Sequence, residues 1–199
     1  MIPRLPPHSA GLRIGLFGGS FDPPHEGHLL VSRIALRRLK LDRLWWLVSP
    51  GNPLKNPSAT PLAERLSACR KAAAHPRIVV SALEAEIRTR FTYDTLRYLR
   101  RRCPGVRFVW IMGADNLIGF HHWRHWREIA ALAPIAVIDR PGATLRAQSA
   151  KAARRFASFR IKEHEATRLA TTSPPAIVYI HDRRLARSST ALRAANGKI

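Results

Sequence analysis

Short apolar runs alternate with helix-like segments along almost the whole chain, and this order restricts the possible folds more than any other feature. The predicted strands are residues 13–17, 44–49, 77–81, 106–112, 135–139 and 177–181. The predicted helices are residues 25–40, 61–75, 92–102, 114–120, 123–132, 149–159 and 188–195. Strands separated by helices form a parallel sheet that helices cover on both faces. We therefore expect an α/β fold with a Rossmann-like, doubly wound parallel sheet.

Length and composition favour one domain. The chain has 199 residues, of which 46% are hydrophobic, and we predict a single domain over residues 1–199 with a flexible, proline-rich extension at 1–11. No segment approaches the roughly 20 apolar residues of a membrane span, and no signal sequence is recognisable. Two widely spaced cysteines, Cys69 and Cys103, are typical of reduced thiols. We expect a cytoplasmic protein without membrane contact, of unspecified oligomeric state.

The net charge of +21 indicates an affinity for anionic partners. Most of the positive charge is arginine, and it is spread along the chain rather than gathered in one run. We interpret it as solvated faces that also attract phosphorylated substrates, without a specific nucleic-acid site. A basic nucleic-acid-binding module is the alternative, and it would bind DNA or RNA with strong salt dependence.

A site is predicted directly after the first strand, in the sequence Gly-Gly-Ser-Phe-Asp-Pro-Pro-His-Glu-Gly-His at residues 18–28. Doubly wound sheets bind ligands at the carboxyl ends of their strands. The glycines allow close approach of a ligand, and we expect Asp22 to cap the next helix with Pro23 at its first position. His25 and His28 are three residues apart and would share one helix face. Together with the helix N-terminus they suit a polyphosphate.

Two motifs carry a family resemblance. Residues 18–28 resemble the first signature of the HxGH nucleotidyltransferases, and Ser-Ser-Thr-Ala-Leu-Arg at residues 188–193 resembles the second. The chain is most similar to the bacterial members that act on nicotinate mononucleotide. The resemblance implies that AMP is transferred from ATP to nicotinate mononucleotide, giving nicotinate adenine dinucleotide and pyrophosphate in NAD biosynthesis.

The resemblance also implies site residues. Those implied in catalysis are His25, His28, Lys55 and Arg193. Those implied in ATP binding are Gly18, Gly19, Ser20, Phe21, His25, His28, Ser188, Ser189, Thr190 and Arg193. Those implied in binding the nicotinate nucleotide are Asn52, Lys55, Thr92, Asp115 and Trp123. Mg²⁺ is expected mainly on the ATP phosphates, since this ion keeps most of its waters.

Several interpretations stay open at this point. Thr92 either lies near the nicotinate ring or belongs to a helix cap, and Asp115 either holds a ribose hydroxyl or steers the metal–phosphate group. Trp126 is expected in the core. The cluster of His121, His122 and His125 invites a zinc interpretation, but no cysteine stands nearby and catalytic zinc sites usually recruit distant ligands too, so we predict no protein-held metal. Nicotinamide mononucleotide and phosphopantetheine are the alternative acceptors.

Overall fold

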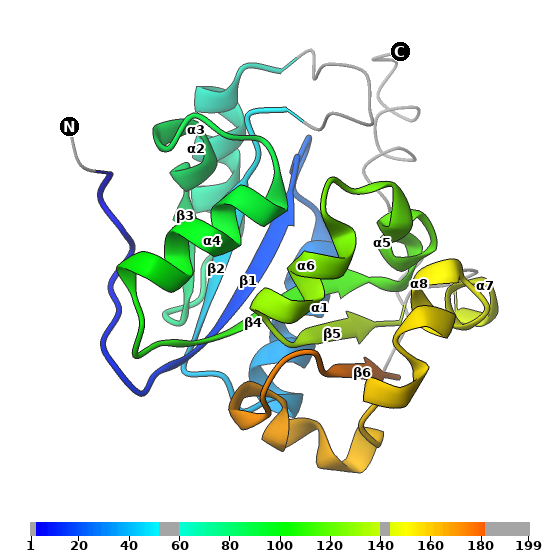
Figure 1. The fold of residues 1–199 in the computed structure, drawn as a ribbon. Helices are drawn as coiled ribbons and strands as arrows, with labels where there is room; N and C mark the ends of the chain where they lie inside the picture. The colour runs from blue at the N-terminus through cyan, green and yellow to red at the C-terminus, as the bar shows by residue number, and fades with distance from the viewer. Residues whose placement is uncertain (1–2, 52–59, 140–143, 182–199) are drawn as a thin grey trace.

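Six parallel strands form a single sheet in the computed structural model, which describes residues 3–51, 60–139 and 144–181 (Figure 1). The strand order is β3-β2-β1-β4-β5-β6, and every neighbouring pair is parallel. The strands are β1 (Arg13–Gly19), β2 (Arg43–Val48), β3 (Ile78–Ser81), β4 (Arg107–Gly113), β5 (Ile135–Ile138) and β6 (Ile177–Ile180). This order confirms the predicted Rossmann-like fold.

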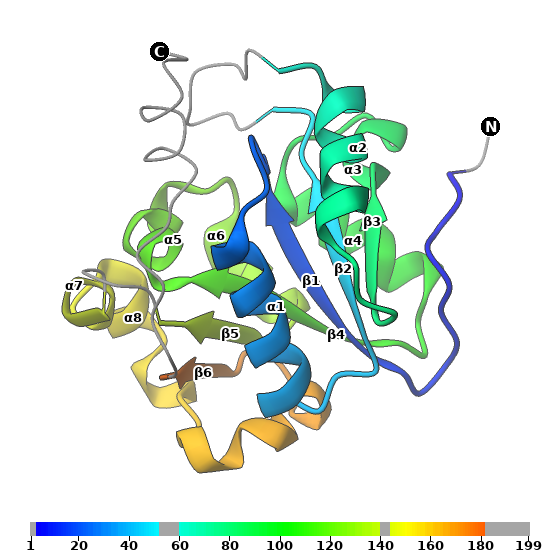
Figure 2. The same ribbon diagram turned by 180° about the vertical axis from the view of Figure 1, so that it is seen from behind.

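Helices cover both faces of the sheet, as the alternating sequence predicted. One face packs against α1 (Glu26–Arg38), α2 (Leu62–Ala72) and the 3₁₀ segment η3 (Glu163–Thr171), of which α1 and α2 lie in front in Figure 2. The other face packs against α3 (Leu83–Glu86), α4 (Thr92–Arg102), α5 (Ala114–Gly119), η1 (Phe120–His122), α6 (Trp126–Leu132), α7 (Thr144–Gln148) and α8 (Lys151–Arg155), followed by η2 (Ala157–Phe159). Within the described residues, no helix combines the length and the hydropathy that crossing a membrane requires.

Successive strand residues enter opposite core clusters, because side chains alternate across a sheet. In β2, Trp45 packs into the cluster on the α4 face and Trp46 into the cluster on the α1 face. Neither indole is exposed to solvent. The two cysteines are also divided between the faces, since Cys103 lies in the first cluster and Cys69 in the second.

The topological switch point lies between β1 and β4. The chain adds β2 and β3 on one side of β1, then returns through α4 to place β4 on the other side. The segments that leave the carboxyl ends of β1 and β4 therefore diverge, which creates the crevice where such sheets bind ligands. Residues 18–28 leave β1 at this point, and residues 113–115 leave β4.

Helix boundaries show where the sequence predictions were wrong. The first helix begins at Glu26, and its N-cap is His25 rather than Asp22. Asp22 and Pro23 each precede a proline, and such residues avoid the helical region, so the helix cannot begin at Pro23. The predicted helix at 149–159 ends at Arg155. The next residue, Phe156, leaves helical geometry and packs its ring against Trp126.

Some predictions were incomplete or fall outside the described residues. The short α3 and the 3₁₀ segment η3 were not predicted at all. The predicted helix at 188–195 lies outside the described residues. In residues 3–11, the His8 ring lies edge-on to Trp45 with centroids 6.1 Å apart, and the Gly11 N–H donates to the Gly105 carbonyl at 2.8 Å. The flexibility expected for this segment stays a prediction.

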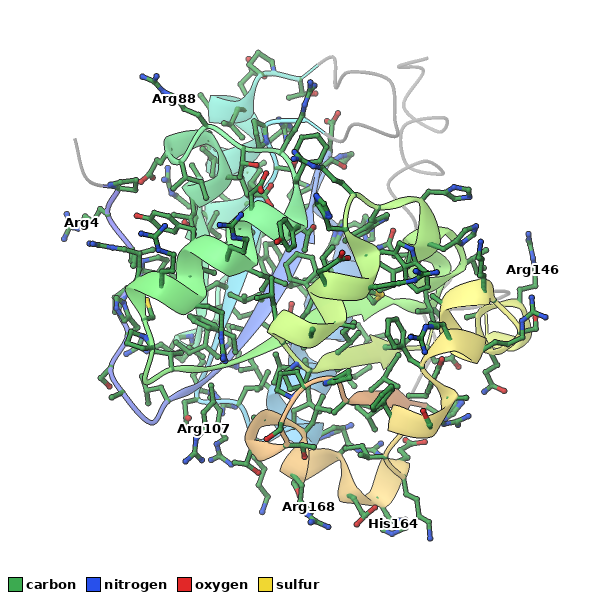
Figure 3. The ribbon with its side chains drawn as sticks, viewed as in Figure 1. Arg4, Arg88, Arg107, Arg146, His164 and Arg168 are labelled. Carbon is green, nitrogen blue, oxygen red and sulfur yellow. The ribbon has the colours of Figure 1, made fainter. Side chains whose placement is uncertain are left out.

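Basic side chains project around the outline of the molecule. Figure 3 labels Arg4, Arg88, Arg107, Arg146 and Arg168, which come from different parts of the chain and point away from the sheet on different sides. All five are exposed. This distribution is that of solvated charge rather than of one concentrated basic face.

Candidate active site

The glycine turn, defined as residues 18–24, leaves β1 under tight packing. A Cβ atom at Gly18 would stand 2.7 Å from Cη2 of Trp110, and one at Gly19 would stand 3.1 Å from Cε2 of Phe21. Real Cβ atoms do not approach another heavy atom as closely as 2.7 Å. Gly18 is therefore required by its neighbour in β4, in addition to any close approach of a ligand that the sequence suggested.

The histidine pair, His25 and His28, starts helix α1. Nδ1 of His25 accepts the Gly27 N–H at 3.0 Å, and the His25 N–H donates to Nδ1 of His28 at 3.2 Å. This is a reciprocal capping box in which two imidazoles replace the usual hydroxyl and carboxylate. Helix capping is the alternative to a functional role for this pair. In the structure, capping uses only one nitrogen of each ring.

The capping bonds fix the tautomer of both rings. A ring nitrogen that accepts an N–H carries no proton, so each neutral imidazole has its proton on Nε2. Nε2 is the nitrogen farther from the backbone, and it is a hydrogen-bond donor in both residues. The ring centroids lie 3.8 Å apart, and each residue is 8% exposed. Two donors thus stand side by side at the switch point.

Aromatic neighbours hold His28 in place. The Phe21 ring centroid lies 4.7 Å from that of His28, and Phe21 stacks on Trp46 at 4.8 Å. Ser32 completes this support, because its hydroxyl donates to the His28 carbonyl at 2.7 Å and accepts the Trp46 indole N–H at 2.8 Å. The whole Phe21 residue is only 1% exposed, so its predicted contact with ATP stays a prediction.

A second region of the crevice is built from α4 and the turn at residues 123–125. Thr92 is the first residue of α4, and the N-cap, Phe91, makes no side-chain hydrogen bond to the helix. The helix-cap interpretation of Thr92 is therefore wrong. The Arg124 guanidinium lies 4.9 Å from the Phe91 ring centroid, and the Tyr93 and His125 rings are 4.5 Å apart. These contacts bring the start of α4 and the turn at residues 123–125 together.

Trp123 is half-buried in this region and presents an aromatic surface. Its ring lies edge-on to Phe120 and Trp110, with centroids 5.3 and 6.2 Å away. Because Trp110 also touches Gly18, one line of contacts joins Trp123 to the glycine turn. Trp126 packs edge-on against Phe120 and Phe156, which agrees with the predicted role in the core.

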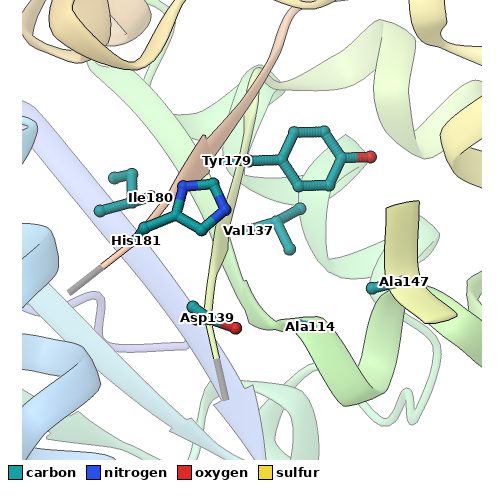
Figure 4. Close-up of a pocket in the computed structure, with 7 residues that line it drawn as sticks. All are labelled: Ala114, Val137, Asp139, Ala147, Tyr179, Ile180 and His181. Atoms are coloured by element: carbon teal, nitrogen blue, oxygen red, sulfur yellow. The ribbon is translucent and has the colours of Figure 1, made fainter. Parts of the chain in front are cut away.

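A small pocket lies at the carboxyl ends of β5 and β6 (Figure 4). Asp139 and His181, the residues that follow these strands, line it with Ala114 at the start of α5. Glu163 accepts hydrogen bonds from the His181 ring and from Arg38, both at 2.7 Å. Burial acts to raise the pKa of Glu163, but these hydrogen bonds outweigh it and hold the pKa below its ordinary value. Asp115, the next residue of α5, is exposed.

Glu84 is a buried carboxyl group that sequence reasoning missed. It belongs to α3 and is 4% exposed. Burial raises its pKa from 4.5 to about 7, although hydrogen bonds from the Ser49 and Thr95 hydroxyls act in the opposite direction. The Thr95 hydroxyl lies 3.2 Å from Oε1 of Glu84. Because α3 has only four residues, its sequence has no periodicity that would have marked Glu84 as buried.

The described residues contain only part of the predicted site. His25, His28 and the glycine turn lie at the end of β1, Asp115 lies at the end of β4, and Thr92 and Trp123 form the second region. The predicted site residues outside the described ranges are Asn52, Lys55, Ser188, Ser189, Thr190 and Arg193.

No metal-binding cluster occurs within residues 3–51, 60–139 and 144–181, in that no three His, Cys, Asp or Glu side chains there could hold an ion. His121 and His122 stack on each other with centroids 3.9 Å apart. His125 contacts Tyr93 instead. The histidine-rich segment therefore does not converge on a common point.

Comparison with known proteins identifies a family and several relatives of this chain. The model of the family described as cytidylyltransferase-like matches residues 16–195. A probable nicotinate-nucleotide adenylyltransferase of Methylorubrum extorquens is 59% identical over 183 residues, which cover 92% of this chain and 99% of that protein. One of a Bradyrhizobium species is 56% identical over 187 residues, covering 94% of this chain and 97% of that protein.

A solved structure supports the fold. Plasmodium falciparum nicotinic acid mononucleotide adenylyltransferase complexed with NaAD superimposes with a TM-score of 0.69, covering 92% of this chain and 83% of that chain. The two sequences are 18% identical, so this similarity concerns the arrangement of the sheet and helices alone.

Proposed function

The chain belongs to the cytidylyltransferase-like family, and from that premise we propose that it transfers the adenylyl group of ATP to nicotinate mononucleotide. The products are nicotinate adenine dinucleotide and pyrophosphate, as in NAD biosynthesis. The relatives at 55–59% identity, matched over 91–94% of this chain, are all named probable nicotinate-nucleotide adenylyltransferase. Both cysteines are free and buried, which fits the reducing cytoplasm that we propose as its location.

The observation that carries this proposal is the histidine pair at the switch point. Each ring uses Nδ1 to close the first turn of α1 and keeps its proton on Nε2. Two neighbouring N–H donors at a helix N-terminus favour phosphate oxygens, because the first-turn amides and the helix dipole add to their effect. Ser, Thr, Asn and Asp are the usual helix caps, so capping alone does not call for an imidazole at both positions.

The reaction needs no covalent enzyme intermediate. A 5′-phosphate oxygen of the mononucleotide forms a bond to the α-phosphorus of ATP while the bond to the bridging α–β oxygen breaks, and pyrophosphate leaves with that electron pair. The protein contributes positioning and electrostatic stabilisation. We assign phosphate contacts to His25 and His28, and backbone contacts to residues 18–21.

The remaining roles fall on residues beyond the described ranges and on the second region. We assign neutralisation of the departing pyrophosphate to Lys55 and Arg193, and further phosphate contacts to Ser188, Ser189 and Thr190. We assign the nicotinate nucleotide to Asn52, Thr92, Asp115 and Trp123, of which Trp123 offers its ring face to the pyridine.

Mg²⁺ fits this site as an ion carried by the nucleotide. Of the described carboxylates after β4 and β5, Asp115 lies in α5 and Asp139 directly follows β5, and neither belongs to a cluster of three potential metal ligands. Such an arrangement suits an ion that keeps several waters and binds through substrate phosphates. When bound, the ion neutralises charge on the phosphates of ATP.

Pyrophosphate release from Mg-ATP with a panel of acceptors tests the proposal. We expect kcat/KM to be at least about tenfold higher for nicotinate mononucleotide than for its amide. A carboxylate accepts hydrogen bonds from the open first-turn amides of α4, whereas an amide NH₂ there stays unpaired at a cost of about 1–3 kcal/mol.

The panel also separates the alternatives. Equal efficiency with the two mononucleotides would contradict the predicted selectivity and indicate a dual-specificity enzyme. Preference for nicotinamide mononucleotide or phosphopantetheine would overturn the proposed acceptor. Absence of pyrophosphate release with every acceptor would overturn the proposed function itself.

A further inference from the structure

Arg65 is a buried cation whose contacts reach beyond its own helix. It lies in α2 and is 3% exposed. Its Nη1 donates to the Ser20 carbonyl at 2.7 Å and to the Ser49 carbonyl at 2.8 Å. Its Nε donates to the Thr60 carbonyl at 3.1 Å. One guanidinium therefore binds backbone oxygens from three separate segments.

These three segments contain or adjoin, in the sequence, residues that are assigned to the proposed site. Ser20 belongs to the glycine turn after β1. Ser49 directly follows β2, and Thr60 directly precedes α2, so they stand on either side of the sequence that contains Asn52 and Lys55. Arg65 thus ties the segment proposed to bind ATP to both sides of the segment proposed to bind the nicotinate nucleotide.

Ser49 is the point where this network joins the sheet. Its N–H donates to the Gly19 carbonyl at 2.9 Å, which extends the pairing of β1 and β2 by one bond. Its hydroxyl lies 3.1 Å from the Gly51 carbonyl and also contacts Glu84. The backbone of Ser49 is therefore held from the glycine turn and from α2, and its side chain is held from α3.

Simple packing does not explain an arginine at this position. Burying a guanidinium costs free energy unless its donors are satisfied, and an apolar side chain would fill the space without that cost. The planar, rigid fork of arginine is suited to holding several oxygens at fixed angles. The buried charge of Arg65 therefore lies where it can hydrogen-bond to the backbone of three segments.

We propose that Arg65 is a positioning residue for the reaction, which sets the distance between the glycine turn and the segment after β2. This inference rests on the proposed function, because those segments are the ones assigned to the two substrates. Arg65 acts through them and touches no reacting atom in the proposed mechanism. Misplacement by about 1 Å costs an enzyme on the order of 10²-fold in rate.

Arg65→Lys is the test variant, because it keeps the charge but not the fork. A lysine ammonium is a point donor and cannot reproduce the set of three carbonyl bonds. We expect kcat/KM for pyrophosphate release to fall about 10- to 100-fold, mostly through kcat, since positioning contributes chiefly in the transition state. Thermal melts of each variant set an assay temperature at which all are folded.

Two controls on the same helix separate positioning from stability. Arg70 is exposed in α2, so Arg70→Lys should leave kcat and KM within about twofold of the parent, as for surface changes generally. Cys69 is fully buried in α2, so Cys69→Ala should lower the melting temperature through a small cavity without lowering kcat. If Cys69→Ala lowered kcat as much as Arg65→Lys does, general destabilisation of α2 would explain both losses. That result would overturn the proposal.

Amide hydrogen exchange supplies a readout that does not depend on activity. Arg65→Lys should accelerate exchange of the Ser49 N–H by about tenfold, a loss of local stability of about 1.4 kcal/mol, with β4 and β5 unchanged. Unchanged exchange at Ser49, or unchanged kcat/KM in an active parent, would overturn the inference. An inactive parent would overturn the proposed function, and the exchange result would still decide whether Arg65 holds these segments.

Discussion

The two regions of the crevice are built in opposite ways. The histidine pair is almost fully buried, each ring is hydrogen-bonded to the backbone, and aromatic side chains pack against it. Thr92 and Trp123, in the second region, are half-buried, and α4 begins without a side-chain cap. One region has a fixed shape before any substrate arrives, whereas the other presents an open aromatic surface and open amides.

This difference matches the two demands of the proposed reaction. Stabilising charge on a reacting phosphate requires donors that do not reorganise, and such donors must be held by the fold. Recognition of a flat ring is less demanding, because an aromatic face tolerates small displacements. We therefore expect changes in the histidine region to act on turnover and changes in the second region to act on acceptor binding. His28→Ala and Trp123→Ala test this division directly, and Glu84→Gln and Arg88→Gly test the segment that precedes α4. The four variants follow from the largest expected effect to the smallest.

His28→Ala should have the largest effect. Losing one donor to developing charge lowers turnover by about 10²–10³-fold. Binding of a nonhydrolysable ATP analogue, measured by calorimetry, should fall much less. The variant also loses a capping partner, which costs about 1 kcal/mol, so a thermal melt must show that it is folded at the assay temperature. Near-normal turnover in the folded variant would remove the histidine pair from the mechanism.

Glu84→Gln sharpens the comparison, because the buried carboxyl group lies beneath the second region. The pKa of Glu84 is raised from 4.5 to about 7 in the folded protein. The folded state therefore binds more protons than the unfolded state between these pH values, and stability falls as pH rises through that interval. The wild-type loss from this group is on the order of 3 kcal/mol, and the variant should lack it.

Urea unfolding at pH 4.5 and pH 8 measures this effect. From pH 4.5 to pH 8, the unfolding free energy of the wild type should fall relative to that of the glutamine variant. Parallel pH dependence in both proteins would contradict the raised pKa. Turnover at pH 8 serves as a second measurement, and we expect it to change far less than in His28→Ala.

Trp123→Ala should raise KM for nicotinate mononucleotide with little change in kcat. An aromatic contact contributes about 0.5–1.5 kcal/mol, so a rise of roughly 2- to 12-fold is expected. A contact made equally in the ground and transition states changes KM alone. Trp126→Phe is the matched control. Trp126 packs against Phe120 and Phe156, so this substitution should leave KM unchanged. A fall in kcat as large as that of His28→Ala would break the proposed division.

Arg88→Gly should have the smallest effect. Arg88 is exposed and has a φ of 56°, in the left-handed region that glycine adopts without strain. Glycine relieves the strain in the folded state, but its greater freedom in the unfolded chain offsets part of this gain. The net effect should stabilise the protein by about 0.5 kcal/mol. Arg90→Gly, at a neighbouring exposed residue, should destabilise it instead. Calorimetry of both variants decides, and destabilisation by Arg88→Gly would contradict the strain argument.

The fold was predictable from the sequence because its signal is repeated. Each strand is a short apolar run, each is followed by a helical segment, and this order is enough to imply a parallel sheet. The predicted bounds of α4 are identical to those observed, since apolar residues recur at helical spacing and Pro104-Gly105 ends the segment. Packing decides the boundary at Phe156. Propensity alone therefore predicted one helix at 149–159, where the structure has the two short elements α8 and η2.

The site was predictable in its residues but not in their contacts. The spacing of His25 and His28 placed both on one helix face, yet their capping bonds depend on backbone angles that no periodicity reveals. Trp110 and Gly18 are distant in sequence and meet only because β4 pairs with β1. Arg65 and Glu84 gave no signal as buried charges, because their burial results from contacts with residues distant in sequence, of which Ser49 is common to both.

The proposed double use of the histidine pair, in capping and in catalysis, has a consequence for how a chain like this evolves. A duplicated copy released from its reaction would still need Nδ1 of both rings to start α1, and losing a cap costs about 1 kcal/mol. Selection for folding alone would thus slow the loss of these residues. The presence of both histidines in a distant homologue is therefore weaker evidence for the reaction than the presence of site residues that have no role in folding.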